Sequence, residues 1–171
     1  MYNESVQPNY KKAEALALDL IDKYNIHEPI VDIFMICEKE GFQVEYFQAK
    51  KDSKEYEIEG AFFRKENKIL INSTRPPKRM VFTLAHELGH AVMHTDVDKD
   101  ILLRDGKSSS ANYLEKEANK FAACLLMPEH MIKQQMEKWG ISSTHPDILA
   151  NLFGVSLQSM NCRLDSIKYK S

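Results

Sequence analysis

The sequence predicts an α+β fold in which helices pack around a small three-stranded antiparallel sheet. The strand-like segments all fall between residues 42 and 73, whereas the apolar residues before and after them recur at helical spacing. Strands that are separated from helices along a chain are typical of α+β folds, because a regular alternation of the two would favour a parallel sheet instead. A hydrophobic content of 43% and a charged content of 28% are ordinary for a globular chain of 171 residues.

The first half of the chain contains two expected helices and then the strands. Apolar residues at helical spacing predict a helix over residues 9–25, and a second over residues 29–41 has Pro29 in its first turn and Gly41 at its end. Alternating polarity and aromatic residues predict a strand over residues 42–47. Residues 56–73 contain two strand-like runs, which we interpret as a hairpin that turns at Asn67.

The second half is mostly helical. A long helix is expected from Pro77 to His94, and further helices over residues 111–127 and 129–140, which Pro128 and Gly140 end. Two short helices within residues 145–170 resemble a helix-turn-helix hairpin. Residues 95–110 are expected to be the least regular segment, with a composition that suits a lid. We expect one domain over residues 1–171, with a core of residues 1–127 and a helical extension of residues 128–171.

Charge and composition exclude several classes of protein. The net charge of −2 gives no overall attraction to nucleic acid or to an anionic membrane. No run approaches the roughly 18 apolar residues of a membrane span, and the N-terminus lacks a signal-peptide pattern, so we expect a cytoplasmic protein without membrane contact. The cysteines are odd in number and far apart, which predicts buried, reduced thiols at Cys37, Cys124 and Cys162.

The segment FTLAHELGHAVMH, residues 82–94, contains an H-E-x-x-H motif on an expected helix. His86 and His90 are four residues apart, so they lie on one face and can bind a single zinc ion. Glu87 is turned by about 100° from that row and is placed to act as the general base for the attacking water. Gly89 costs a helix stability, which indicates that another element or the substrate approaches closely there.

A catalytic zinc ion needs a third protein ligand beyond the two histidines. His94 lies about 12 Å from His86 along a straight helix, so we place it at the edge of a cleft or in a structural role. The helix over residues 111–127 offers two glutamates, of which Glu115 shares a face with small residues that permit close approach. Asn119, one turn later on that face, can hold the second ring nitrogen of a histidine ligand. Glu117 remains the rival third ligand.

These two segments, FTLAHELGHAVMH and LEKEANKFAACLLMP, resemble the ImmA/IrrE-type zinc metallopeptidases over nearly the whole chain. The resemblance implies a zincin-like active-site helix, with zinc held by His86, His90 and a glutamate of the 115–117 pair, and with Glu87 as the base. It also implies an intracellular zinc-dependent endopeptidase that cleaves a partner repressor with an XRE-type helix-turn-helix domain, or an antitoxin. A non-proteolytic binding module of a toxin–antitoxin system is the alternative.

Two further expectations concern partners of the site. An extended substrate is expected to add to an edge strand at residues 60–64, which brings Gly60, Ala61 and Phe62 into the cleft. Tyr113 and His145 are candidates for a donor that stabilises the oxyanion in addition to zinc. A DNA-binding regulator acting through residues 145–170 is the other alternative. Its expected recognition helix carries only Arg163, Lys168 and Lys170, so we do not expect direct binding of nucleic acid.

Overall fold

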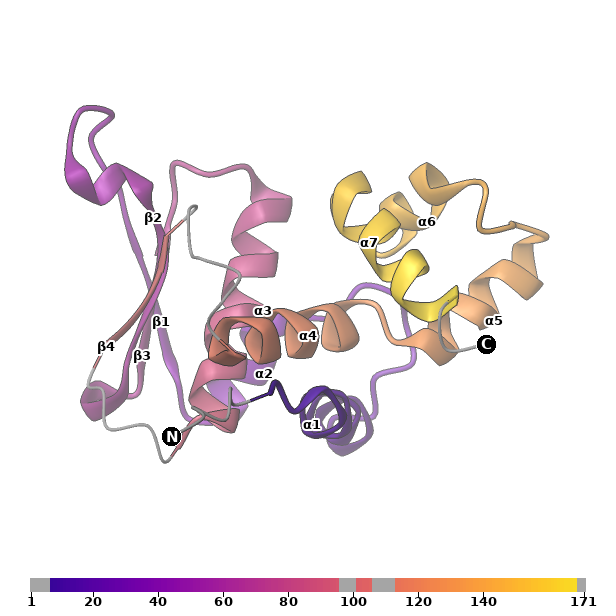
Figure 1. Cartoon of the computed structure of the whole chain (residues 1–171), viewed down its shortest axis with the longest axis horizontal. Helices are drawn as coiled ribbons and strands as arrows, with labels where there is room; N and C mark the ends of the chain where they lie inside the picture. The colour runs from indigo at the N-terminus through magenta and orange to yellow at the C-terminus, as the bar shows by residue number, and fades with distance from the viewer. Residues whose placement is uncertain (1–6, 96–100, 106–112, 169–171) are drawn as a thin grey trace, which may run out of the picture.

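The computed structural model describes residues 7–95, 101–105 and 113–168. These residues form a mixed sheet with helices packed on one side of it in successive layers (Figure 1). In chain order the regular elements are α1 (Tyr10–Lys23), α2 (Ile33–Lys39), β1 (Gln43–Phe47), β2 (Ile58–Phe63), β3 (Lys68–Asn72), α3 (Pro77–Met93), β4 (Ile101–Asp105), α4 (Tyr113–Leu126), α5 (Glu129–Trp139), α6 (Pro146–Leu152) and α7 (Leu157–Lys168). The α+β class predicted from the sequence is therefore confirmed.

The sheet differs from the expected one in two respects. It has four strands in the order β1-β3-β2-β4, and it is mixed, because β1 runs parallel to β3 while β2 is antiparallel to both β3 and β4. After β1 the chain crosses to β2, which lies on the far side of β3 from β1, and the hairpin then brings it back into β3. Strand β3 therefore runs in the same direction as β1. The fourth strand lies in the segment expected to be irregular, since a run of five residues between polar stretches gives almost no periodic signal.

Local signals decide where most elements begin and end. Asn67 adopts the left-handed conformation at the β2–β3 turn, as predicted, and Gly140 does the same at the end of α5. The second helix begins later than expected, at Ile33, where the side chain of Asp32 accepts a hydrogen bond from the backbone N–H of Met35. Pro29 therefore precedes this helix and does not belong to its first turn.

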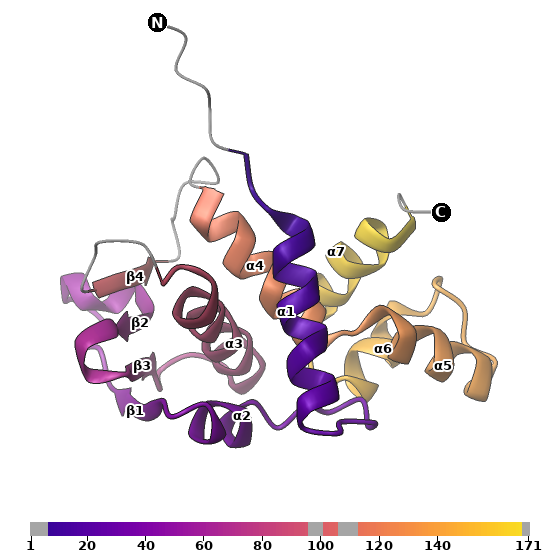
Figure 2. The same ribbon diagram turned by 90° about the horizontal axis from the view of Figure 1, so that it is seen from below.

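Helix α3 lies between the sheet and α4, as Figure 2 shows, and is almost entirely buried from Thr83 to Ala91. Its close contact with α4 depends on Gly89. A Cβ atom at this position would lie 2.9 Å from Cδ1 of Phe121 and 3.3 Å from the Cα of Ala118. The expectation that another element approaches this glycine is confirmed, and that element is α4 rather than a substrate.

We expect the substitution Gly89→Ala to destabilise the protein, although alanine is the better helix former. Helix propensity alone would stabilise the variant by about 1 kcal/mol, whereas the overlap with Phe121 is expected to cost about 1–3 kcal/mol. Urea denaturation of the variant measures the balance, and the double variant Gly89→Ala/Phe121→Leu should recover part of the loss. An increase in the free energy of unfolding for the single variant would contradict the close packing.

The helices α5, α6 and α7 lie together beyond α4, on the side away from the sheet (Figure 1). Leu149, Phe153 and Met160 from this group belong to the same hydrophobic cluster as the residues of α3 and α4. Arg163, the central basic residue of the expected recognition helix, is 3% exposed, and its Nε donates to the carbonyl oxygen of Met127 at 2.9 Å. It is therefore not presented to a DNA backbone.

Two other expectations can be compared with these helices. Cys37 and Cys124 are buried, as expected, but Cys162 on α7 is exposed. The side chain of Lys168 and all of Lys170 lie outside the described residues. Within the described part of the chain, no helix is both long enough and apolar enough to cross a membrane.

Candidate metal centre

Three electron-pair donors from α3 and α4 converge in the interior of the protein. Nε2 of His86 and Nε2 of His90 lie 3.0 Å apart, since both rings project from one face of α3. The carboxylate of Glu115 reaches both of them, at 3.2 Å from His86 and 3.0 Å from His90. The histidine rings are buried and the glutamate side chain is 13% exposed. These three residues form a group that could hold a metal ion, with donor atoms within 4.8 Å of one another.

The other nitrogen of the His86 ring is held by α4. Its Nδ1 lies 3.0 Å from Oδ1 of Asn119, which lies one turn after Glu115. An amide oxygen can only accept a hydrogen bond, so Nδ1 of His86 carries the proton and Nε2 keeps its lone pair. The contact that the sequence suggested for Asn119 is therefore present.

The ring of His90 is held by a second buried histidine. Nδ1 of His90 lies 2.9 Å from Nδ1 of His94, and Nε2 of His94 lies 2.8 Å from Oε2 of Glu117. The other oxygen of Glu117 accepts the backbone N–H of Asn9 at 2.6 Å. Because a carboxylate accepts, His94 donates from Nε2 and accepts at Nδ1, which leaves His90 protonated at Nδ1 and with a free lone pair on Nε2.

These proton positions make the centre a site for a cation. Two imidazole lone pairs and a carboxylate face one another, and such a group is stable only with a positive charge among its members. Burial alone would raise the pKa of Glu115, but a proton on Nε2 of His86 or His90, which takes the place of the cation when no metal ion is bound, outweighs that effect and holds the pKa well below its usual range. Two histidine nitrogens, one carboxylate oxygen and an open position are the ligand set of catalytic zinc sites, so the residues present fit a zinc ion.

The two glutamates of α4 thus face different neighbours. Glu115 lies beside His86 and His90, whereas Glu117 is buried against His94 and the segment before α1. Burial lowers the pKa of His94 more than the bond to Glu117 raises it, so this ring is neutral near pH 7. The sequence did not suggest a contact between His94 and Glu117. The one sequence feature that could have indicated a role for His94 near the centre is that it continues the row of His86 and His90 by one more turn.

Glu87 is fully buried and projects toward β2 rather than along the row of histidines. Gly60 of β2 lies close to this side chain. A Cβ atom on residue 60 would lie 3.2 Å from Oε1 of Glu87 and 2.6 Å from Cγ2 of Thr83. A glycine at residue 60 therefore leaves room for the Glu87 side chain between α3 and the sheet.

The remaining residues singled out in the sequence have no contact with the three metal-binding side chains among the interactions of the described residues. Residues 60–64 do not form a free edge, because β2 pairs with β3 on one side and with β4 on the other. Ala61 and Phe62 are buried, and Phe62 packs edge-on against Phe42. Tyr113 is the first residue of α4 and is partly exposed. His145 precedes α6, where its ring contacts Ser142 and Thr144.

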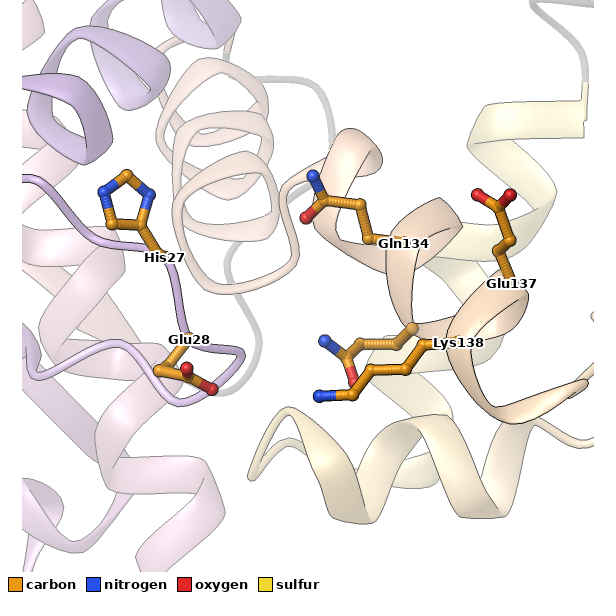
Figure 3. Close-up of a pocket in the computed structure, with 6 residues that line it drawn as sticks. His27, Glu28, Gln134, Glu137 and Lys138 are labelled. Carbon is orange, nitrogen blue, oxygen red and sulfur yellow. The ribbon is translucent and has the colours of Figure 1, made fainter.

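Two surface hollows differ in their relation to the centre. A groove of about 1040 Å³ is lined by residues of α3, α4 and α7, including Asn119, and therefore adjoins the histidines. A smaller hollow of about 370 Å³ lies between the segment after α1 and α5. Its lining is polar, with His27 and Glu28 across from Gln134 and Lys138 (Figure 3). It contains none of the residues of the metal centre.

Comparison with known proteins finds one matching family and several relatives. The sequence model of the family Peptidase_M78, described as the IrrE N-terminal-like domain, matches residues 37–165. The radiation response metalloprotease IrrE of Deinococcus radiodurans is 40% identical over 84 residues, which cover 48% of this chain and 26% of that protein. IrrE of Deinococcus deserti is 37% identical over 84 residues, or 30% of its length. The uncharacterized immunity region protein 2 of Bacillus phage phi105 is 36% identical over 81 residues, or 51% of its length.

The matched segments thus span between about a quarter and a half of these curated relatives. A solved structure of a Mycobacterium tuberculosis transcriptional regulator superposes with a TM-score of 0.59 at 14% identity. The superposition covers 90% of this chain and 46% of that one. At this identity the likeness shows the fold alone.

Proposed function

The chain belongs to the Peptidase_M78 family of IrrE N-terminal-like domains, and we propose that it is a zinc-dependent endopeptidase that acts on a regulatory protein. The observation that carries the proposal is the convergence of His86, His90 and Glu115, with Glu87 one residue along the same helix. The names of the relatives, a radiation response metalloprotease and a phage immunity region protein, support a protease in a regulatory setting.

In this proposal His86, His90 and Glu115 hold the zinc ion, which when bound polarises the scissile carbonyl group and favours deprotonation of the attacking water. Asn119 fixes the ring of His86, and the pair of His94 and Glu117 fixes the ring of His90. Each histidine then presents Nε2 to the centre. Glu115 supplies a charge that remains negative over the whole physiological range, because its pKa is lowered.

Glu87 is the general base in this mechanism. It takes the proton of the attacking water and returns it to the amine of the leaving peptide, which balances the hydrolysis of one amide bond. Its side chain is buried beside Gly60 of β2, which limits the space in which the carboxylate can turn. Burial also strengthens its interaction with the proton that it transfers.

The substrate strand is proposed to add to β4 instead of β2. Strand β4 is the edge of the sheet beside β2, the strand against which Glu87 packs. An extended peptide can pair with the free backbone groups of such an edge. The proposed substrate is a helix-turn-helix repressor of the XRE type or an antitoxin, and zinc, a cytoplasmic location and the absence of direct nucleic-acid binding belong to the same proposal.

Incubation of the purified protein with a repressor encoded beside it, with and without a zinc chelator, tests this function. We expect fragments of the repressor only when zinc is present, and mass spectrometry locates the bond that is cleaved. The same incubation is carried out with a complex mixture of unfolded peptides. The peptidase function would be rejected if the repressor remained intact in both samples and these peptides were not cleaved either.

We expect the substitution His94→Ala to weaken zinc binding by about 10- to 100-fold, because His90 loses the acceptor that fixes its ring. Glu117→Gln, which keeps the volume of the side chain, should weaken binding in the same direction. Competition with a chromogenic chelator measures both affinities, and His27→Ala on the exposed segment after α1 is the matched control. An unchanged affinity in both variants would show that the pair does not position His90.

A further inference from the structure

The groove beside the metal centre lies between the start of α3, the exposed face of α4 and the helix α7. Its lining includes the apolar side chains of Phe82, Ala123 and Met127, with Pro76 and Pro77 at the start of α3. A volume of about 1040 Å³ is enough for several side chains of a bound peptide. Nothing in the roles proposed above for the zinc site requires a hollow of this size.

The groove is continuous with the proposed zinc site. Glu115, Asn119 and Ala123 are spaced four residues apart on α4, so they form one row along the helix. Asn119 contacts His86 and also lines the groove. Ala123 lies about 12 Å along the helix axis from Glu115. A peptide in extended conformation covers this distance with about four residues.

The lining of the groove carries positive charge only. Lys78, Arg79, Lys120 and Arg163 line it, and none of the described residues that line it is acidic. Arg79 is balanced by Glu59, to which it donates hydrogen bonds from Nε and Nη2. Nζ of Lys120 lies 3.8 Å from Oε2 of Glu14 on α1, so this lysine is partly balanced by an acidic residue outside the groove.

The partners of two of these cations are neutral among the described residues. Nζ of Lys78 lies 3.2 Å from the amide oxygen of Asn151. Arg163 donates to the carbonyl oxygen of Met127, and its Nη1 lies 3.5 Å from the hydroxyl oxygen of Ser166. A guanidinium group that is only 3% exposed is costly to bury without an anion, so a carboxylate that enters the groove is attracted to it.

We propose that this groove binds a segment of the protein substrate that carries both acidic and apolar side chains, about four residues from the bond that is cleaved. The inference rests on the proposed peptidase function, since it gives the groove the role of selecting the substrate. Apolar side chains occupy the space next to Phe82, Ala123 and Met127. Acidic side chains pair with Lys78, Lys120 and Arg163.

Selection of binding peptides tests the proposal independently of cleavage. A displayed library of random 16-residue peptides is selected on the zinc-loaded, full-length Glu87→Gln variant, so that bound peptides are not hydrolysed. We expect the selected peptides to be rich in Asp and Glu together with apolar residues. Their affinity, measured by fluorescence anisotropy, should fall at least tenfold for Lys78→Glu/Lys120→Glu and remain unchanged for the control Lys11→Glu/Lys39→Glu, which lies outside the groove.

A charge-swap experiment completes the test. Peptides in which every acidic residue is replaced by lysine should bind the Lys78→Glu/Lys120→Glu variant better than the original peptides do. The proposal would be overturned if the selected peptides were neutral or basic, or if no peptides were selected. It would also be overturned if the groove substitutions left the affinities unchanged. Sedimentation showing that the groove substitutions dissociate a dimer would overturn it as well, since a second copy of the chain would then be the occupant. If the wild-type protein cleaves nothing but the acidic peptides still bind, the peptidase function fails and the binding site stands.

Discussion

The substitution Glu87→Gln is expected to abolish peptide hydrolysis while the protein keeps its zinc. Glutamine preserves the volume of the side chain between α3 and β2 but cannot accept the proton of the attacking water. Loss of a general base lowers the rate by about 10²- to 10⁴-fold. Two quantities are measured on the same preparation. Mass spectrometry gives the rate at which the substrate is hydrolysed, and metal analysis gives the zinc content.

The matched control for this variant is Glu38→Gln, which changes an exposed carboxylate on α2 in the same way. It should hydrolyse the substrate at the wild-type rate. If Glu87→Gln cleaves as fast as the control, Glu87 is not the base. If it cleaves nothing but has also lost zinc, the side chain supports the fold of the centre and not the proton transfer.

The substitution Glu115→Gln is expected to reduce zinc affinity by more than about 100-fold, a larger loss than that of any residue that only positions a ligand. The reason is that Glu115 provides the negative charge between His86 and His90. Glu117→Gln, two residues away on the same helix, is the comparison, with an expected loss of about 10- to 100-fold. Chelator competition on the two variants ranks the glutamates directly.

The ranking separates the two assignments of the third ligand. A larger loss for Glu117→Gln than for Glu115→Gln would mean that α4 turns a different face to the histidines when zinc is bound. Equal and small losses would mean that neither glutamate is a ligand. Circular dichroism of both variants excludes unfolding as the cause.

The local features of the chain were the most accessible from its sequence. The helix that carries His86 and His90, the turn at Asn67 and the stop at Gly140 each depend on residues near one another in the chain, so spacing and residue type predict them. The pairing of α3 with α4 was also inferred, since Gly89 and the small residues of α4 leave room for close contact. The family resemblance pointed to the same two helices.

Features that depend on contacts between distant segments were not predicted. Nothing within β1 or β3 determines that they run parallel, and β4 is too short for its alternation to be recognised. The bond between His94 and Glu117 joins residues 23 positions apart and becomes visible only when both helices are placed. The burial of Arg163 likewise depends on how α7 packs against the end of α4, where it reaches the carbonyl group of Met127.

A crystal structure of the zinc-loaded protein with data collected above and below the zinc absorption edge tests the central claim most directly. The account predicts one anomalous difference peak at the point where Nε2 of His86, Nε2 of His90 and the carboxylate of Glu115 converge, with His94 and Glu117 outside its ligand shell. A protein that binds zinc with its peak at other residues, or that shows no peak in this group, would contradict it.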